Sequence, residues 1–219
     1  MSSLRLHAHP YSNNSMRASI ALEEKDLAYE YVHVDLFTKA NRSPEYLAIN
    51  PRGQVPCLVD GDAVVYESVA IVEYLEHRFP KPSLIPHDKK AMAACFRRIG
   101  EFHQKLDPKN VFGSVRFRGQ RRDELGPRLG ALVDECALWE QYLEAGDYFG
   151  VESFSIADIV VLPFFATVID GLGLPDSRFP ALHAWYARCR ERPSVAAQRW
   201  FEAFAADKAN AELKVLADV

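Results

Sequence analysis

A proline-rich segment divides the chain into two parts with different hydrophobic patterns. The segment FPKPSLIP, residues 79–86, carries three prolines in eight positions. Proline fixes φ and has no amide hydrogen to donate, so such a run disfavours helices and strands and is typical of a linker. We therefore predict one domain over residues 1–80, a linker over 81–87 and a second domain over 88–219.

The first part has short patterns that alternate between strand and helix. Apolar residues alternate in LRLHAH and in AYEYVHVDL. VPCLV and AVVYE flank DGD, where Asp60 and Gly61 would supply the positive φ angles of a tight hairpin. SMRASIALEEKD and SVAIVEYLEHRF have helical spacing. The predicted order is strand, helix, strand, loop, strand, strand, helix, which makes a small mixed α/β domain.

Helical patterns fill the second part. A core-facing stripe with i, i+3, i+4, i+7 spacing consists of Leu129, Leu132, Val133, Cys136, Trp139 and Leu143. Further helices are predicted near residues 88–107, 156–170, 179–191 and 195–206. The motif FSIAD predicts a capping box, with Ser155 as N-cap and Asp158 three residues later. We expect an all-α second domain.

Composition excludes several classes of function. The chain has 26 basic and 30 acidic residues, and its net charge of −4 provides no general attraction for nucleic acid or an anionic membrane. The four cysteines are far apart and lack the CxxC spacing of metal or redox pairs, so we predict buried, reduced thiols. No apolar run reaches the roughly 18 residues of a membrane span, and we expect a soluble cytoplasmic protein.

The stretch PYSNNSMR stands between the first strand and the first helix and allows two interpretations of Ser12. Its hydroxyl oxygen can cap the helix by accepting from a free amide of the first turn. A hydroxyl at the positive end of a helix can also donate to a thiolate or phosphate bound there. The local residues leave both interpretations open.

Two later motifs also have a structural and a ligand-binding interpretation. In GQVPCLV, Pro56 either opens an edge strand as a trans proline, or follows a cis bond that turns the Val55 amide and carbonyl toward a peptide ligand. In YES, Ser68 either caps a helix beside a solvated Glu67, or the two bind the carboxylate and ammonium groups of an amino acid. Together the motifs suggest a ligand with an amino-acid end at Glu67-Ser68, an extended peptide at Val55 and a reactive group near Ser12. Glutathione has this layout.

Three segments resemble the cytosolic glutathione transferases, and within them the serine-type phi, theta and zeta classes. They are SNNSMRASIALEEKDLAYE, RSPEYLAINPRGQVPCLVDGDAVVYES and FSIADIVVLPFF, and the similarity spans essentially the whole chain. The resemblance implies a thioredoxin-like α/β domain with a cis Pro56, followed by an all-α helical-bundle domain. It also implies glutathione as cosubstrate and a homodimer.

The resemblance assigns roles to individual residues. Ser12 is similar to the catalytic serine, which directs its hydroxyl at the glutathione sulfur, and Asn14 can add an amide donor. Ser15 or Tyr11 would be the alternative donor, although Ser15 suits a first-turn cap better. Glutathione contacts are implied at Asn41, Arg42, Gln54, Val55, Pro56, Glu67 and Ser68.

The chain departs from related classes at two places. Asn41 and Arg42 stand where phi-type enzymes place His-Lys for the glycine carboxylate, so only the cation is kept. Beta- and omega-type members carry a cysteine in the early loop, and none lies between Pro10 and Arg17, so we do not expect a protein cysteine to react. We predict no metal, because ligand spacing is absent around His7, His9 and His103.

The implied reaction is conjugation of glutathione to hydrophobic electrophiles, with peroxide reduction by the same thiolate as an added activity. Ser12 would act as a hydrogen-bond donor, and the nucleophile is the sulfur of glutathione. Two other functions stay open. One is a glutathione-dependent cis-trans isomerase similar to maleylacetoacetate isomerase of the zeta class, although SNNS lacks the Ser-Ser-Cys pattern of that class. The other is a non-catalytic binding module on the same fold.

The segment NVFGSVRFRGQRR, residues 110–122, is the candidate wall for the electrophile. Phe112 and Phe117 offer apolar contact, while Arg116 belongs to a cluster of arginines that would favour an anionic acceptor. The alternative is a solvated loop, because charge runs are usually surface features.

Overall fold

The computed structural model describes residues 4–218 and divides into two compact units. The first unit contains the chain up to Leu84 together with Ala196–Ala203, and the second contains Ile85–Val195 and the chain from Phe204 onward. The first unit thus continues past residue 80, and it includes a distant segment that the sequence patterns did not indicate.

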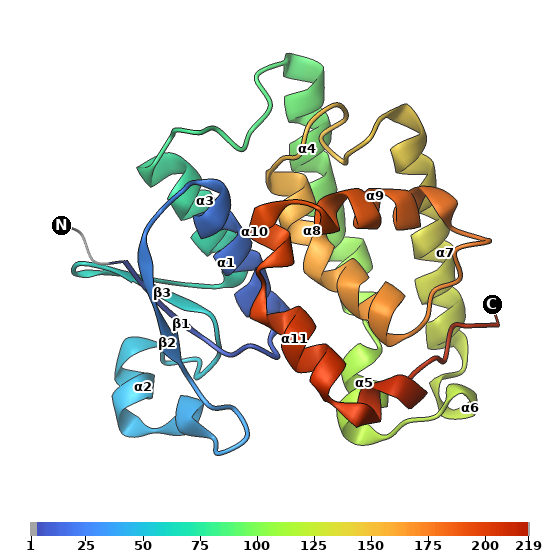
Figure 1. Ribbon diagram of the computed structural model, residues 1–219, viewed down its shortest axis with the longest axis horizontal. Coiled ribbons are helices and arrows are strands. Elements are labelled where there is room, and N and C mark those ends of the chain that lie inside the picture. The colour runs from blue at the N-terminus through green and yellow to red at the C-terminus, as the bar shows by residue number, and fades with distance from the viewer. Residues whose placement is uncertain (1–3, 219) are drawn as a thin grey trace. The chain divides into compact units, whose positions relative to one another are not determined.

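The first unit is built on a four-stranded sheet (Figure 1). Its strands are β1 (Leu4–Ala8), β2 (Tyr29–His33), β3 (Cys57–Asp60) and β4 (Ala63–Tyr66), in the order β2-β1-β3-β4. β1 and β2 are parallel, and the other neighbours are antiparallel. Parallel neighbours need a crossover connection, which α1 (Asn13–Glu24) provides, and α1 packs against α3 (Ser68–Arg78). The predicted strands and these two helices are confirmed.

The hairpin between β3 and β4 differs in detail from the prediction. Gly61 has a φ of +62°. Asp60, however, remains the last residue of β3 and pairs with Ala63. Only the glycine therefore uses the left-handed region, which it enters without the steric cost of a Cβ atom.

The stretch between β2 and β3, predicted as a loop, contains a 3-10 turn (Ala40–Arg42) and the helix α2 (Pro44–Ile49). Ser43 caps α2, because its side chain accepts from the amide of Tyr46 at 3.2 Å. Proline is favoured at the first helical position, where its missing amide hydrogen would have no partner. The pair Ser43-Pro44 was thus a helix-start signal that the pattern reading missed.

A buried ion pair attaches the proline-rich segment to the first unit. Lys25 Nζ lies 2.7 Å from Glu76 Oε2 and donates to the carbonyl of Pro82 at 2.8 Å. The Glu76 carboxylate also accepts from the Ser83 hydroxyl at 3.0 Å and from the Leu84 amide at 3.1 Å. These bonds offset the desolvation of two charges whose side chains are 0% and 7% exposed.

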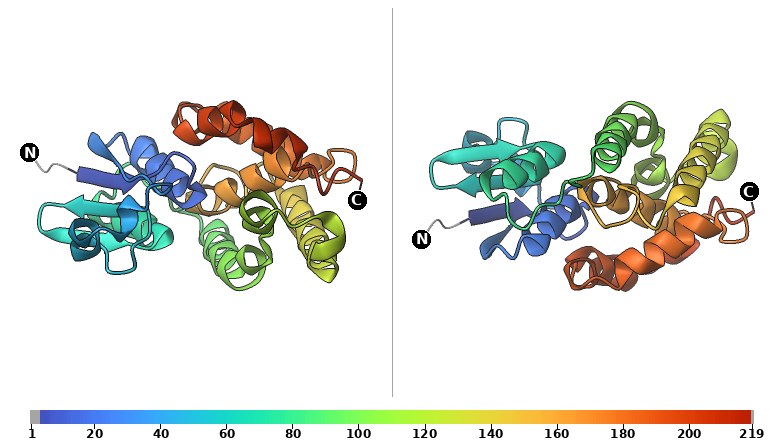
Figure 2. Two further views of the ribbon diagram at one scale, coloured as in Figure 1. Left: turned by 90° about the horizontal axis from the view of Figure 1, so that it is seen from below. Right: turned by 90° about the horizontal axis from the view of Figure 1, so that it is seen from above.

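The second unit is helical, as predicted. Its helices are α4 (Lys89–Glu101), α5 (Phe112–Arg118), α6 (Arg122–Leu125), α7 (Pro127–Tyr142), α8 (Ile156–Ala166) and α9 (Pro180–Arg190), and the division between the units crosses α10 (Pro193–Ala196) and α11 (Arg199–Ala206). α8 packs against α4 and α9, and α7 packs against α9 (Figures 1 and 2). All six members of the predicted stripe on α7 and the turn after it are buried. No helix within residues 4–218 has both the length and the apolar character needed to cross a membrane.

The capping box predicted at the start of α8 is confirmed. The Ser155 side chain accepts from the amide of Ala157, and Asp158 Oδ2 accepts from the Ser155 amide at 2.9 Å. The other oxygen of Asp158 accepts from the Phe149 amide and from Trp185 Nε1, both at 2.9 Å. Burial raises the pKa of Asp158, and these donors stabilise its carboxylate in the core.

The four cysteines are free and buried, as predicted. Burial raises the pKa of Cys57 to about 11 and that of Cys136 to about 12. Because the thiolate is the reactive form of cysteine, these two thiols are poor nucleophiles near neutral pH.

Candidate active site

Ser12 is the N-cap of α1. Its Oγ accepts from the Ser15 amide at 3.1 Å, and its own amide donates to the His9 carbonyl at 3.0 Å. A hydroxyl that accepts one bond still has its hydrogen to donate, and no acceptor for it lies among the described residues. The capping role is confirmed, and it leaves a donor at the positive end of the helix.

The Val55-Pro56 peptide bond is cis, as the resemblance implies. Pro56 precedes β3, whose ladder with β1 begins at the pair Cys57 and His7, so Val55 lies outside the ladder. The carbonyl of the preceding residue, Gln54, accepts from Tyr46 Oη at 2.6 Å and from Asn50 Nδ2 at 2.8 Å. These two bonds from the region of α2 anchor the turn.

Burial raises the pKa of Tyr46 to about 12. Its phenol therefore keeps its hydrogen at neutral pH and continues to donate to the Gln54 carbonyl.

Asn41 and Arg42 lie over the glycine that precedes this turn. Asn41 Nδ2 donates to the Gly53 carbonyl at 2.7 Å, and Arg42 Nη1 donates to the Arg52 carbonyl at 3.2 Å. Gly53 has a φ of +59°, and a Cβ there would lie 2.8 Å from Arg42 Nη1 and 2.8 Å from the Asn41 carbonyl oxygen. Only glycine allows this close approach.

Helix α3 begins one residue earlier than a Ser68 cap would require. Glu67 occupies the N-cap position without a side-chain capping bond, and Ser68 is the first helical residue. Glu67 has a φ of +70°, which is sparsely populated for a residue with a side chain. Such conformations cost on the order of 1–3 kcal/mol and cluster at binding sites. The expectation that Ser68 is the N-cap is therefore corrected.

Arg17 is a buried cation that the sequence analysis did not assign to the site. The residue is 2% exposed, and its Nη1 donates to Asn14 Oδ1 at 2.8 Å and to Ser68 Oγ at 2.6 Å. It joins α1 to the start of α3. One feature of the sequence could have indicated this role. Arg17 follows Asn14 by three residues, which is one helical turn, on a helix face that is otherwise buried.

These elements enclose a cavity of about 250 Å³ within the first unit. Its lining residues are Ser12, Asn14, Leu36, Asn41, Arg42, Asn50, Gly53, Gln54, Val55, Pro56, Glu67 and Ser68. All nine residues predicted to activate or bind glutathione line this one cavity. It is lined by one acidic side chain, from Glu67, and one basic side chain, from Arg42, so it can hold both charged ends of a small peptide.

The alternative donors near Ser12 do not line this cavity. Ser15 is buried, and its Oγ accepts from the His9 amide at 3.3 Å, so it is not the cap that we expected. The Tyr11 amide donates to His9 Nδ1 at 3.1 Å, and its ring lies 6.5 Å from that of Phe37.

A group of potential metal ligands lies near the end of β2. The ligand atoms of His9, His33 and Asp35 are within 4.8 Å of one another. His9 Nδ1 already accepts from the Tyr11 amide, so the neutral ring carries its hydrogen on Nε2 and offers no lone pair there. Asp35 Oδ1 accepts from the Phe37 amide at 2.9 Å. These bonds engage two of the three side chains, and the absence of a metal stays a prediction.

The residues predicted to contact the electrophile belong to α5 in the second unit. Phe112 is buried, with its ring 6.1 Å from that of Phe204, whereas Phe117 is 58% exposed. Arg116 forms an ion pair with Asp207 and donates to Asn210 Oδ1 at 2.9 Å.

The other arginines of this segment also have partners. Arg118 donates to the Ser114 hydroxyl, Arg121 pairs with Asp123 at 3.1 Å, and Arg122 lies 3.6 Å from Asp218. The cluster is therefore largely neutralised within the second unit.

Comparisons with known proteins bear on the family and the fold of the chain. The model of the glutathione S-transferase N-terminal domain matches residues 6–83, and that of the C-terminal domain matches residues 120–188. Glutathione S-transferase A of Pleuronectes platessa is 34% identical, with 85% of this chain and 88% of the relative covered. A zeta-class glutathione S-transferase of Euphorbia esula is 31% identical, with 86% of this chain and 87% of the relative covered. Among solved structures, the theta-class glutathione S-transferase of Xanthomonas axonopodis pv. citri with glutathione bound has a TM-score of 0.80 and is 27% identical. The match covers 90% of this chain and 97% of that chain.

Proposed function

This chain belongs to the cytosolic glutathione S-transferase family, and from that membership we propose how its first unit activates glutathione for conjugation to hydrophobic electrophiles. Glutathione is the cosubstrate. The observation that carries the proposal is the cavity at the N-terminus of α1, where the Ser12 hydroxyl caps the helix and keeps its own hydrogen available.

Glutathione binds in this cavity as an extended peptide. Its γ-glutamyl end, with ammonium and carboxylate groups, meets Glu67 and Ser68 together with the first amides of α3. The central peptide pairs with the Val55 backbone as an added strand. The glycine carboxylate lies toward Arg42, the basic side chain that lines the cavity.

The reaction depends on the acidity of the glutathione thiol. A free thiol has a pKa near 8.5, so only a few per cent is thiolate at neutral pH. Lowering that pKa by about two units needs roughly 2.7 kcal/mol of preference for the anion. A hydrogen bond from Ser12 to the charged sulfur, at about 1.5–3 kcal/mol, and the helix N-terminus, at about 0.3–1 kcal/mol, supply this amount.

The thiolate then attacks the electrophilic carbon. Its sulfur lone pair forms the new S–C bond, and an aryl halide loses halide with the electrons of the broken bond. Ser12 keeps its hydrogen throughout, because it acts only as a donor. No protein cysteine takes part, which agrees with the burial of all four and the raised pKa of Cys57.

The acceptor and the assembly belong to the proposal as well. Exposed Phe117 offers apolar surface, with Phe112 behind it, and Arg116 is neutralised by Asp207. Neutral hydrophobic acceptors are therefore favoured over anionic ones.

The proposal includes a homodimer in the cytoplasm. On α4, Met92 and Phe96 are 36% and 47% exposed and one turn apart, and they offer apolar surface for such an interface.

A glutathione-dependent isomerase is the second candidate, because a zeta-class enzyme is among the relatives. The chain has Asn13 and Asn14 where that class has Ser-Cys, so conjugation is preferred. Parallel assays with an aryl halide and with a cis-dicarbonyl substrate such as maleylacetoacetate decide between them. Retention on immobilised glutathione without turnover of either substrate would instead identify a binding module.

A further inference from the structure

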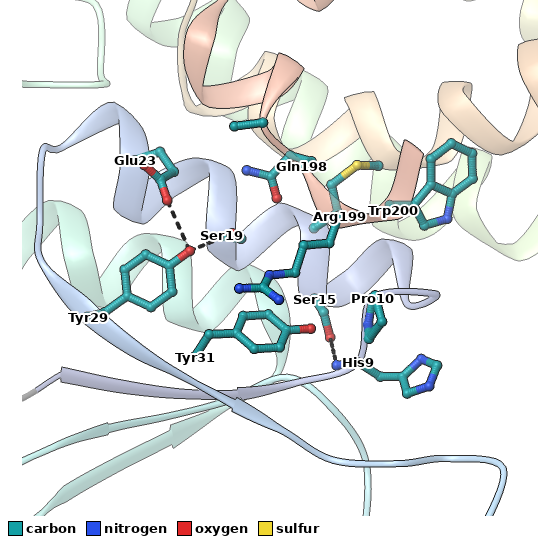
Figure 3. A pocket seen from close by; sticks show the side chains of 12 residues that line it. His9, Pro10, Ser15, Ser19, Glu23, Tyr29, Tyr31, Gln198, Arg199 and Trp200 are labelled. Carbon is teal, nitrogen blue, oxygen red and sulfur yellow. Dashed lines mark hydrogen bonds between the residues drawn. The ribbon is translucent and has the colours of Figure 1, made fainter. Parts of the chain in front are cut away.

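A second cavity, of about 160 Å³, lies in the first unit and shares α1 with the candidate active site but none of its lining residues. Its walls are a different stripe of α1, the strand β2 and the segment from Ala197 to Trp200 (Figure 3). A cavity of about 150 Å³ is large enough for one benzene ring. The space thus fits a single small organic molecule.

The Tyr31 hydroxyl gives this cavity a polar group in need of a partner. Its oxygen is buried and has no hydrogen-bond partner among the described residues. Figure 3 shows the ring beneath the Arg199 side chain, with the hydroxyl directed toward Ser15. Burial raises the pKa of Tyr31 to about 12, so the group is a donor at neutral pH. Buried polar groups without partners are rare because they destabilise the fold.

Arg199 gives the same cavity a cation. Its guanidinium carbon is 4.3 Å from the centre of the Tyr31 ring. No carboxylate within the described part of the chain forms an ion pair with it. The guanidinium therefore has donors left for a ligand, in the planar fork that matches a carboxylate.

Glu23 is the acidic side chain in the wall, but it has other partners. Its Oε1 accepts from Tyr29 Oη at 3.1 Å, and Tyr29 Oη is also bonded to the Ser19 hydroxyl at 2.9 Å (Figure 3). This chain of three polar groups belongs to α1 and the start of β2. It engages Oε1 of Glu23, and no ion pair joins Glu23 to Arg199 within the described residues.

We propose that this cavity binds one small organic carboxylate of about the size of benzoate. The carboxylate accepts from Arg199 and from the Tyr31 hydroxyl. The apolar body of the ligand packs against Met16 and Trp200, which also line the cavity. The rest of the wall is mostly polar, with Ser15, Ser19 and Gln198 among its residues, so the site suits a small ligand with a charged group rather than a purely apolar one.

The test uses the full-length protein with its methionine methyl groups labelled with ¹³C and with saturating glutathione present. Met16 lines the cavity, and Met92 on α4 is the internal control. Titration with sodium benzoate should shift the Met16 methyl signal to saturation below about 10 mM while leaving Met92 unchanged. Benzamide and benzylamine, which lack the carboxylate, should bind at least about tenfold more weakly.

Variants separate this site from the active site. Arg199→Gln should weaken benzoate binding by about tenfold or more, and Tyr31→Phe by about fivefold, because each removes a hydrogen bond to the charged ligand. Arg178→Gln is the matched control, since Arg178 is also exposed and lies 5.4 Å from the centre of a ring, that of Phe179, outside this cavity. The Arg178→Gln variant should bind benzoate as tightly as the parent protein does.

Two results would overturn the proposal. One is a Met16 signal that does not respond to benzoate, and the other is equal affinity in Arg199→Gln and the parent protein. Arg199→Gln should keep the aryl-halide conjugation rate, whereas Ser12→Ala should lose most of that rate and keep benzoate binding. Failure of this proposal and failure of the proposed function are therefore distinguishable.

Discussion

The guanidinium of Arg17 donates to Ser68 Oγ at 2.6 Å, across 51 positions of the sequence. The same Nη1 donates to Asn14 Oδ1 at 2.8 Å. One buried cation thus sets the positions of two side chains in the same cavity, one on α1 near Ser12 and one at the start of α3. This contact connects the sulfur end of the proposed glutathione site to its γ-glutamyl end.

Arg17→Met should raise the KM for glutathione by about tenfold while reducing kcat much less, because Ser68 loses a charge-assisted donor that orients it. Arg17→Lys keeps the charge and should show a smaller rise. Steady-state kinetics with varied glutathione measure both, with melting temperatures to follow stability. A KM unchanged in Arg17→Met would exclude the positioning role.

Ser12→Ala should lower kcat by about 10–100-fold, since it removes a hydrogen bond of roughly 1.5–3 kcal/mol to the thiolate. The glutathione dissociation constant should change by less than about threefold, because the remaining contacts stay. Without Ser12 the thiol pKa rises toward its free value, so the rate loss should be larger at pH 6.5 than at pH 9. Ultraviolet absorbance of the bound thiolate follows that pKa directly.

Ser12→Thr keeps a hydroxyl and should retain much of the activity, and Ser15→Ala is the control within the same turn. Normal turnover in Ser12→Ala together with a loss in Ser15→Ala would transfer the donor role to Ser15.

Gly53→Ala should weaken glutathione binding, because a Cβ there meets Arg42 Nη1 and the Asn41 carbonyl oxygen at 2.8 Å. Gly61→Ala is the matched control: its φ is similarly positive, and nothing lies within 4 Å of its Cβ position. Both should lose about 1–2 kcal/mol of folding free energy from the backbone conformation. Only Gly53→Ala should also raise the glutathione KM. Equal KM values in the two variants would contradict the close contact.

Phe117→Ala should raise the KM for a hydrophobic acceptor by about three- to tenfold, since burying a phenyl ring against substrate contributes about 1 kcal/mol or more. The glutathione KM should not change, because Phe117 belongs to the second unit. Leu138→Ala provides the comparison, since Leu138 is likewise an exposed apolar residue, on α7. Identical acceptor kinetics in both variants would remove α5 from the proposed acceptor site.

Local patterns predicted most of the architecture. Alternation over LRLHAH and AYEYVHVDL predicted β1 and β2, and the stripe from Leu129 to Leu143 predicted α7, because side-chain periodicity follows directly from backbone geometry. The capping box at Ser155 depends on residues three apart, so it too could be read from the chain. The helix α2 was missed because six residues are too few to show a helical period, although its cap signal was present.

The candidate site was predictable to the extent that its residues stand in short motifs. Ser12, Val55-Pro56 and Glu67-Ser68 each stand at a junction between two elements, and the structure places all of them around one cavity. The left-handed φ of Glu67 could not be anticipated, since glutamate has no local preference for it and the surrounding structure must hold it there.

The sequence by itself determined the periodic elements, their caps and the turn residues of the site, because these follow from interactions within a few residues. Only the tertiary structure decided that Ala196–Ala203 joins the first unit, that Arg17 meets Ser68, and that Arg116 is neutralised by Asp207, 91 positions away. Such contacts depend on which surfaces the folded chain brings together, and no short-range preference encodes the partner of a charge far along the chain.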